Sequence, residues 1–247
     1  MISVVIIAKN SARTIARTLG SLQRFQEVII YDNGSTDNTI DICKHFSNVK
    51  VIQGDFIGFG ATKNKAATYA RNEWIFSLDS DEYIDDLLYE EIMCQDFVNP
   101  LNIFTLKRDN YFDGKKIRFC GWGNDYIVRI YNKTKHSLKE NLVHEYIETN
   151  KNSINTKLLN SFSHDGIQDI NQLIDKMKFY TDLGSKDRET KWILVPIAKF
   201  LFRFFKTYII KLGILEGYRG LFLSMYYANI SFFKYFKRYL NYKKRKK

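Results

Sequence analysis

Trp74-Ile-Phe-Ser-Leu-Asp-Ser-Asp-Glu82 is a short apolar run that passes directly into acidic residues. An apolar run of this length predicts a buried strand. Side chains two positions apart on an extended chain point the same way, so Asp79 and Asp81 can present two carboxylates to one ion. Mg²⁺ and Mn²⁺ prefer oxygen ligands and bind through one or two carboxylates together with substrate phosphates. The alternative is a solvated turn in which Ser80 or Asp81 caps a helix.

Outward from this segment, apolar runs alternate with amphipathic helical patterns. We expect strands at residues 2–8, 27–31, 49–53 and 74–78, separated by helices at residues 11–22, 36–46 and 61–70. Further along, strands are expected at 103–108 and 125–131, an extended piece at 141–147 and a helix at 169–184. Strands separated by helices predict a parallel sheet with right-handed crossovers. The sequence therefore predicts an α/β fold with a mostly parallel, Rossmann-like sheet flanked by helices.

Three polar clusters follow predicted strands, and in parallel sheets ligands bind at the carboxyl ends of the strands. The clusters are Ala8-Lys-Asn10, Asp32-Asn-Gly-Ser-Thr-Asp37 and Asp79-Ser-Asp-Glu82. Asp32 is placed to accept hydrogen bonds from a base or a ribose, and Ser35 or Asp37 is a suitable cap for the next helix. Alone, the second cluster is equally well explained as a turn and a cap. The edge that all three clusters share favours a binding site.

Four stretches together resemble the family-2 glycosyltransferases, which are inverting enzymes with the GT-A fold. They are Ser3-Val-Val-Ile-Ile-Ala-Lys-Asn10, Val28-Ile-Ile-Tyr-Asp-Asn-Gly-Ser-Thr-Asp37, Gly60-Ala-Thr-Lys-Asn-Lys-Ala66 and Trp74-Ile-Phe-Ser-Leu-Asp-Ser-Asp81. The resemblance covers residues 1–165 and implies a uridine diphosphate (UDP) sugar as donor, with Mg²⁺ or Mn²⁺ as cofactor. The residues that it implies for the donor and metal are Ala8, Asn10, Asp32 on the uracil or ribose, Lys63 where the family often has Arg, Asp79 on the ribose or metal, and Asp81 on the metal.

A later part of the sequence resembles the small lipopolysaccharide-core glucosyltransferases of Gram-negative bacteria. The matching stretches are Gly121-Trp-Gly-Asn-Asp-Tyr-Ile-Val-Arg-Ile-Tyr131, Val143-His-Glu145 and Ile214-Leu-Glu-Gly-Tyr-Arg-Gly-Leu221. This resemblance implies transfer of a hexose, with glucose expected, to a lipid-linked saccharide such as a lipopolysaccharide or lipooligosaccharide core. Another surface glycan would give the same pattern.

An inverting transfer needs a carboxylate that takes the proton of the acceptor hydroxyl. Asp125 matches the acceptor-side acid of the family, and Glu145 is its rival, with a structural salt bridge as the other explanation for Glu145. His144 is a candidate metal ligand because imidazole suits Mn²⁺ better than Mg²⁺. A buried, hydrogen-bonded core histidine is the alternative for His144, and it is favoured for His164.

The basic residues are concentrated in the last part of the chain. The formal net charge is +11, yet residues 191–247 contain 14 of the 38 Lys and Arg residues and one of the 27 acidic residues. Lys199, Arg203 and Lys206 lie on one helical face among Phe and Leu side chains, a pattern typical of helices at a membrane interface. We expect residues 166–247 to form a helical, amphipathic, membrane-associating region that meets an anionic surface. A core-packing helix pair with a solvated face is the alternative.

Composition limits the other classes of function. The three cysteines form no CxxC pair, so neither a zinc site nor a disulfide framework is indicated, and a reducing compartment is expected. The chain shows neither a signal-peptide pattern at Met1 nor an apolar run of about 18 residues, so a peripheral location on the cytoplasmic face of the inner membrane is expected. A nucleic-acid-binding protein that uses the basic, aromatic tail is the alternative class. A nucleotidyltransferase is disfavoured because no Gly-rich triphosphate loop follows the first predicted strand.

Overall fold

The computed structural model describes residues 1–139, 146–148, 151–167, 169–186 and 188–246. Its backbone divides into two compact units. The first unit comprises Met1–Asp109 and Asp125–His164, and the second comprises Asn110–Asn124 and Asp165–Lys247. The sequence analysis separated the chain at residue 165 and did not anticipate that Asn110–Asn124 belongs with the C-terminal helices.

The first unit contains the parallel strands that the sequence predicts. Their spatial order is β3, β2, β1 and β4, with parallel pairing throughout. Their bounds are Ile2–Ala8 for β1, Val28–Asp32 for β2, Val49–Gln53 for β3 and Trp74–Asp79 for β4. β1, β2 and β4 are buried along almost their whole length because helices cover both faces of the sheet.

Beyond β4 the sheet continues with antiparallel strands. β8 pairs antiparallel with β4 and β6, and the order then runs through β9 to β5, with the short β7 paired to the far end of β6. The bounds are Glu82–Tyr83 for β5, Asn102–Phe112 for β6, Lys115–Lys116 for β7, Tyr126–Asn132 for β8 and Ile154–Ile167 for β9. The sheet is therefore mixed, and β4 is the strand at which its parallel half meets its antiparallel half.

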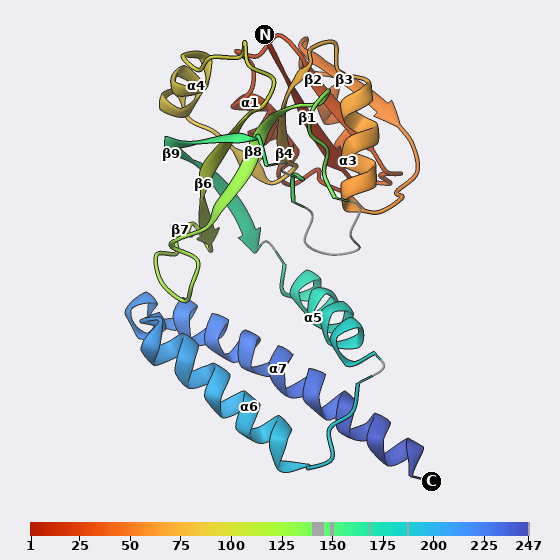
Figure 1. The fold of residues 1–247 in the computed structure, drawn as a ribbon, viewed down its shortest axis with the longest axis vertical. Helices are drawn as coiled ribbons and strands as arrows, with labels where there is room; N and C mark the ends of the chain where they lie inside the picture. Colours follow the sequence, from red (N-terminus) through yellow and green to blue (C-terminus); the bar gives the residue numbers. More distant parts are fainter. Residues whose placement is uncertain (140–145, 149–150, 168, 187, 247) are drawn as a thin grey trace. The chain divides into compact units, whose positions relative to one another are not determined.

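Four helices of the first unit cover this sheet. Figure 1 shows α3 beside β1 to β3, and α1 and α4 on the other side of the sheet. The bounds are Ile15–Gly20 for α1, Thr39–Cys43 for α2, Phe59–Thr68 for α3 and Asp86–Met93 for α4. α1 and α2 are shorter than predicted because hydrogen bonds of Ser11 and Asp37 form turns where the helical pattern was expected to begin.

The second unit is mainly helical. α5 and α6 both pack against the long α7, and a π-helical turn η1 and a 3₁₀ turn η2 connect α6 to α7 (Figure 1). The bounds are Ile170–Ser185 for α5, Leu194–Phe205 for α6, Lys206–Ile210 for η1, Gly213–Glu216 for η2 and Tyr218–Arg245 for α7. None of the described helices is both long enough and apolar enough to cross a bilayer.

Candidate functional site

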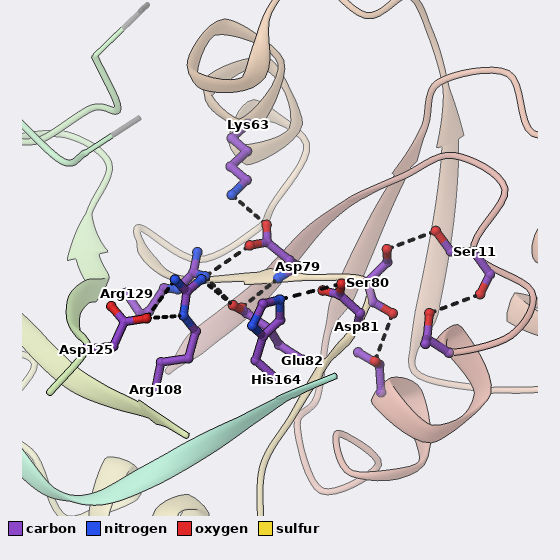
Figure 2. A network of polar contacts seen from close by, with 12 residues as sticks. Ser11, Lys63, Asp79, Ser80, Asp81, Glu82, Arg108, Asp125, Arg129 and His164 are labelled. Atoms are coloured by element: carbon purple, nitrogen blue, oxygen red, sulfur yellow. Dashed lines mark hydrogen bonds and ion pairs between the residues drawn. The ribbon is translucent and has the colours of Figure 1, made fainter. Parts of the chain in front are cut away.

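Asp79 stands at the end of β4 and is paired with two cationic side chains. Its Oδ1 lies 2.6 Å from Lys63 Nζ on α3, and its Oδ2 lies 3.0 Å from Arg129 Nη2 on β8. Figure 2 shows each cation contacting a different oxygen of the carboxylate. The fold thus brings together two residues that the sequence predicts for the donor site, Lys63 and Asp79.

These two cations control the charge of Asp79. Burial alone would raise the pKa of this carboxyl, but the charges and hydrogen bonds of Lys63 and Arg129 outweigh burial and hold the pKa well below its usual range. Lys63 is only 1% exposed, whereas the side chain of Asp79 is 32% exposed. Asp79 is therefore an ionised carboxylate that is accessible from one side.

Glu82 lies beneath Asp79 and connects it to two arginines. The Glu82 side chain is fully buried; its Oε2 accepts a hydrogen bond from the Asp79 backbone N–H at 3.0 Å, and its Oε1 is bonded to Arg129. Arg108 Nη1 lies 3.5 Å from the same Oε1. Burial raises the pKa of Glu82, and the charge of Arg129 opposes this shift.

Asp125, the predicted acceptor-side acid, is held by Arg108. Arg108 Nε and Nη2 lie 2.9 Å and 2.8 Å from Asp125 Oδ2. Because Arg108 also approaches Glu82, charges alternate without a break from Lys63 through Asp79, Arg129, Glu82 and Arg108 to Asp125 (Figure 2). The ionic network thus links the predicted donor carboxylate to the predicted base.

Asp81 has a different partner. His164 Nε2 on β9 lies 3.6 Å from Asp81 Oδ2, and Figure 2 shows the two side chains side by side. Burial would lower the pKa of His164, but its hydrogen bond to Asp81 and the Asp81 charge raise it. The sequence analysis favoured a core role for His164, whereas the structure brings its ring to a predicted metal ligand.

The donor set at Asp81 fits a divalent ion in part. Within the ranges that the structure describes, no three His, Cys, Asp or Glu side chains form a metal cluster. The side chains at this place are one carboxylate and one imidazole, and diphosphate oxygens of a substrate would complete the coordination. Asp79 faces two cations, so Asp81 and His164 are the side chains suited to a metal.

Ser80 fixes the turn between these two carboxylates. Its Oγ lies 2.8 Å from Ser11 Oγ, and its carbonyl accepts a hydrogen bond from Thr18 Oγ1 at 3.0 Å. Both partners come from the β1–α1 region. The turn is therefore attached to the neighbouring strand end, which keeps Asp79 and Asp81 directed toward different groups.

Asp32 forms the turn after β2. Its carboxylate is fully buried and accepts hydrogen bonds from the Gly34 and Ser35 backbone N–H groups at 3.1 Å and 3.0 Å, and from Ser35 Oγ. Ala8 pairs with Asp32 in the register of β1 and β2. Much of the hydrogen-bonding capacity of Asp32 is thus used locally, and its contact with a base or ribose stays a prediction.

Asn10 ties the end of β1 to that turn. It adopts a left-handed conformation with φ of 51°, and its Oδ1 accepts a hydrogen bond from the Thr36 N–H at 2.8 Å. Its own N–H donates to Ser35 Oγ at 2.9 Å. Because β1 also pairs with β4 in the register Ile7 to Asp79, the three predicted clusters do meet at one edge of the sheet.

Two predicted site residues, His144 and Glu145, lie outside the residues that the structure describes. Three residues to which the sequence assigns no role also enter the network, namely Glu82, Arg108 and Arg129. A signal existed for Arg129, because an arginine inside the apolar run of β8 needs a buried anion. Only the antiparallel pairing of β8 with β4 identifies that anion as Asp79 and Glu82.

The comparisons with known proteins identify the family of the chain. The model of Glycosyl transferase family 2 matches residues 3–153. An uncharacterized glycosyltransferase of Rickettsia typhi is 30% identical over 94% of this chain and 85% of its own length. The lipopolysaccharide core biosynthesis glycosyltransferase LpsC of Rhizobium meliloti is 28% identical over 36% of this chain and 34% of its own length.

Among solved structures, S. aureus TarS 1–349 in complex with UDP-GlcNAc is 15% identical to this chain. The similarity covers 99% of this chain and 92% of the TarS chain. The TM-score between the two chains is 0.49. The family match spans more than half of the chain and includes the carboxyl ends of β1, β2 and β4. The chain is a glycosyltransferase with the GT-A fold and belongs to glycosyl transferase family 2.

Proposed function

We propose that the protein transfers a hexose, with glucose expected, from a UDP-sugar to a saccharide acceptor with inversion at the anomeric carbon. The observation that carries this proposal is that Asp79 and Asp81 have different partners. Asp79 is ionised and fixed by Lys63 and Arg129, while Asp81 lies beside His164. One carboxylate is therefore rigid enough to bind a ribose, and the other is suited to an ion at the diphosphate.

Mg²⁺ or Mn²⁺, when bound, would offset the charge that develops on the leaving diphosphate. Asp81 and His164 are the residues that would hold it, and His164 must lose its proton to do so. Asp125 takes the proton of the attacking acceptor hydroxyl. Arg108 orients the Asp125 carboxylate, and Glu82 in turn fixes Arg108.

A lipid-linked saccharide, such as the core of lipopolysaccharide or lipooligosaccharide, is the acceptor class that we propose. The name of the Rhizobium meliloti relative, which refers to lipopolysaccharide core biosynthesis, supports this class. The excess of positive charge in residues 191–247 supports an anionic membrane as the place of reaction. The proposed location is peripheral, on the cytoplasmic face of the inner membrane.

The test is a transfer assay with a set of nucleotide-sugars, Mg²⁺ or Mn²⁺, and a lipopolysaccharide-core acceptor. We expect Asp81→Asn to lower transfer by at least about 100-fold, because the ion at the diphosphate loses its carboxylate ligand. His164→Ala should raise the Mn²⁺ concentration required for half-maximal transfer by about 10-fold.

Asp86→Asn is the matched control, since Asp86 is an exposed carboxylate on α4 that pairs with the surface residue Arg24. It should leave transfer unchanged. Full activity of Asp81→Asn with every donor would refute the assignment of this site.

A further inference from the structure

The loop that precedes β8 and the turn between α6 and α7 form one structure within the second unit. Glu216 Oε1 accepts hydrogen bonds from the backbone N–H groups of Arg118 and Phe119 at 2.7 Å and 3.1 Å. The Cys120 N–H donates to the Lys211 carbonyl at 3.0 Å. Arg219 adds hydrogen bonds to two carbonyls at the end of β6. Two segments about 100 residues apart in sequence therefore present a common surface.

A pocket of about 290 Å³ opens on this surface. It is lined by Lys115, Lys116, Arg118, Phe119, Leu215 and Glu216. Three of the six lining residues are cationic, and the one carboxylate is buried and already accepts two backbone N–H groups. The pocket thus combines positive charge with two apolar side chains, a combination that suits an anionic group attached to an apolar body.

Aliphatic side chains are exposed beside this pocket. Five of the seven residues from 209 to 215 have exposed fractions between 43% and 62%. They are Ile209, Ile210, Leu212, Ile214 and Leu215, here called the aliphatic tip. Soluble surfaces rarely keep so many neighbouring aliphatic groups in water, and such patches mark interaction sites.

The backbone of the turn exposes the tip at a conformational cost. Leu212 has a φ of 54°, a left-handed conformation that is unfavourable for a residue with a branched side chain. Next to it, a side chain at Gly213 would come within 2.8 Å of the Thr207 carbonyl and 2.9 Å of Cys120 Sγ. The preceding turn η1, which ends at Ile210, is π-helical. π-Helical turns are rare in proteins, and those that occur are often found at functional sites.

We propose that the pocket and the aliphatic tip together form a seat for an anionic phospholipid at a bilayer surface. The lipid phosphate binds among Lys115, Lys116 and Arg118, and Ile214 and Leu215 enter the boundary of the acyl chains. Charge complementarity selects this occupant over a neutral protein partner, because three of the six residues that line the pocket are cationic and its one carboxylate already accepts two backbone N–H groups. The proposal rests on the proposed function insofar as the acceptor is lipid-linked.

The test measures cosedimentation of the full chain with vesicles of phosphatidylcholine alone or mixed with phosphatidylglycerol. Lys115→Gln combined with Arg118→Gln should weaken binding to the anionic vesicles by about 25-fold, at about 5-fold for each charge near the surface. Lys243→Gln combined with Lys244→Gln removes the same charge from the C-terminal basic run. This control should weaken binding clearly less than the pocket pair does, because its side chains lie outside the pocket.

The apolar half of the seat has its own pair of variants. Leu215→Asn should weaken binding to the anionic vesicles by about 10-fold, which corresponds to partial burial of one leucine in the acyl boundary. Leu240→Asn on α7 is the control, since Leu240 is 41% exposed and lies away from the tip in sequence. Thermal unfolding of each variant shows whether the second unit remains folded.

Equal losses in the pocket pair and the terminal pair would show that bulk charge alone binds the membrane, and would overturn the seat. A pocket variant that binds anionic vesicles normally but no longer binds duplex DNA would also overturn it, in favour of a nucleic-acid surface. Metal-dependent binding of UDP is followed in every variant. If the wild type binds UDP but not vesicles, the seat alone is wrong; if it binds vesicles but not UDP, the donor-site proposal alone is wrong.

Discussion

Lys63 illustrates how one side chain contributes to both stability and function. Its ammonium group is nearly inaccessible to water and is paired with Asp79 at 2.6 Å. Removing one partner of a buried pair leaves an uncompensated charge and is strongly destabilising. The sequence suggested Lys63 only through its resemblance to a family position, whereas the structure gives it a definite task. It keeps the Asp79 carboxylate ionised and fixed.

The pH dependence of stability should report this pairing. The pKa of Asp79 is lower in the folded protein than in the unfolded chain, so its contribution is complete above the unfolded pKa and is lost as pH falls through the folded value. We expect Lys63→Met to lower the free energy of unfolding by about 3 kcal/mol at neutral pH. The loss is not larger because Arg129 still pairs with Asp79. The variant should also lose less stability than the wild type on acidification.

Urea unfolding at neutral pH and near pH 3, which is below the ordinary Asp pKa, measures both effects. Lys65→Met is the matched control, because Lys65 is an exposed residue of the same helix. An unchanged unfolding free energy in Lys63→Met, or an effect equal to that of Lys65→Met, would contradict this account.

At the scale of elements, the parallel half of the sheet was predictable and the antiparallel half only partly so. β1, β2 and β4 are nearly uninterrupted apolar runs because both of their faces are buried. β9 shows no regular alternation of buried and exposed residues, and the two-residue β5 is too short for any periodic signal. Such strands are specified by their partners rather than by their own composition.

The candidate site was likewise predictable only in part. Asp79 and Asp81 could be found because they directly follow an apolar strand, and that strand end is a local feature of the sequence. The partners of these carboxylates, Arg129 and His164, lie on β8 and β9, about 50 and 83 residues further along the chain. Strand register brings them close, and register is not encoded in any single segment.

The network across these elements leads to a kinetic prediction for Glu82. Glu82→Gln removes the anion that Arg108 and Arg129 share, so Arg108 is held less firmly beside Asp125. We expect kcat of transfer to fall by about 10-fold, because the proposed base is less well oriented, while KM for the donor changes little.

Steady-state kinetics measure kcat and the KM for the donor. Glu90→Gln is the control, since Glu90 is an exposed residue of α4 paired with Arg24. A rise in KM for the donor without a change in kcat would show that Glu82 supports only the donor side of the network.

At the scale of the whole molecule, charge is unevenly distributed along the chain. Residues 1–190 carry a formal net charge of −2, and residues 191–247 carry +13. A near-neutral catalytic part and a strongly basic C-terminal part respond differently to ionic strength, because salt screens exposed charges over about 10 Å or less. The donor-site ion pairs are mostly buried and are screened much less.

Raising the salt concentration should therefore separate membrane binding from donor binding. We expect binding to phosphatidylglycerol vesicles to weaken by at least about 10-fold between low salt and several-fold physiological salt, with metal-dependent UDP affinity changing by less than about 2-fold. Cosedimentation and calorimetry in the same buffers measure the two affinities. Parallel losses in both would indicate that the donor site itself depends on the basic C-terminal region.

The ion pair between Arg108 and Asp125 has one more consequence. Arg108 Nε and Nη2 both contact the same oxygen of Asp125, so on the proposed assignment a guanidinium stands where the acceptor hydroxyl must approach Oδ2. Solvent is always present as a rival nucleophile for an activated sugar. We expect Asp125 Oδ2 to become accessible only when an arriving acceptor draws Arg108 toward its own oxygens, so that the sugar is passed to a glycan rather than lost to water.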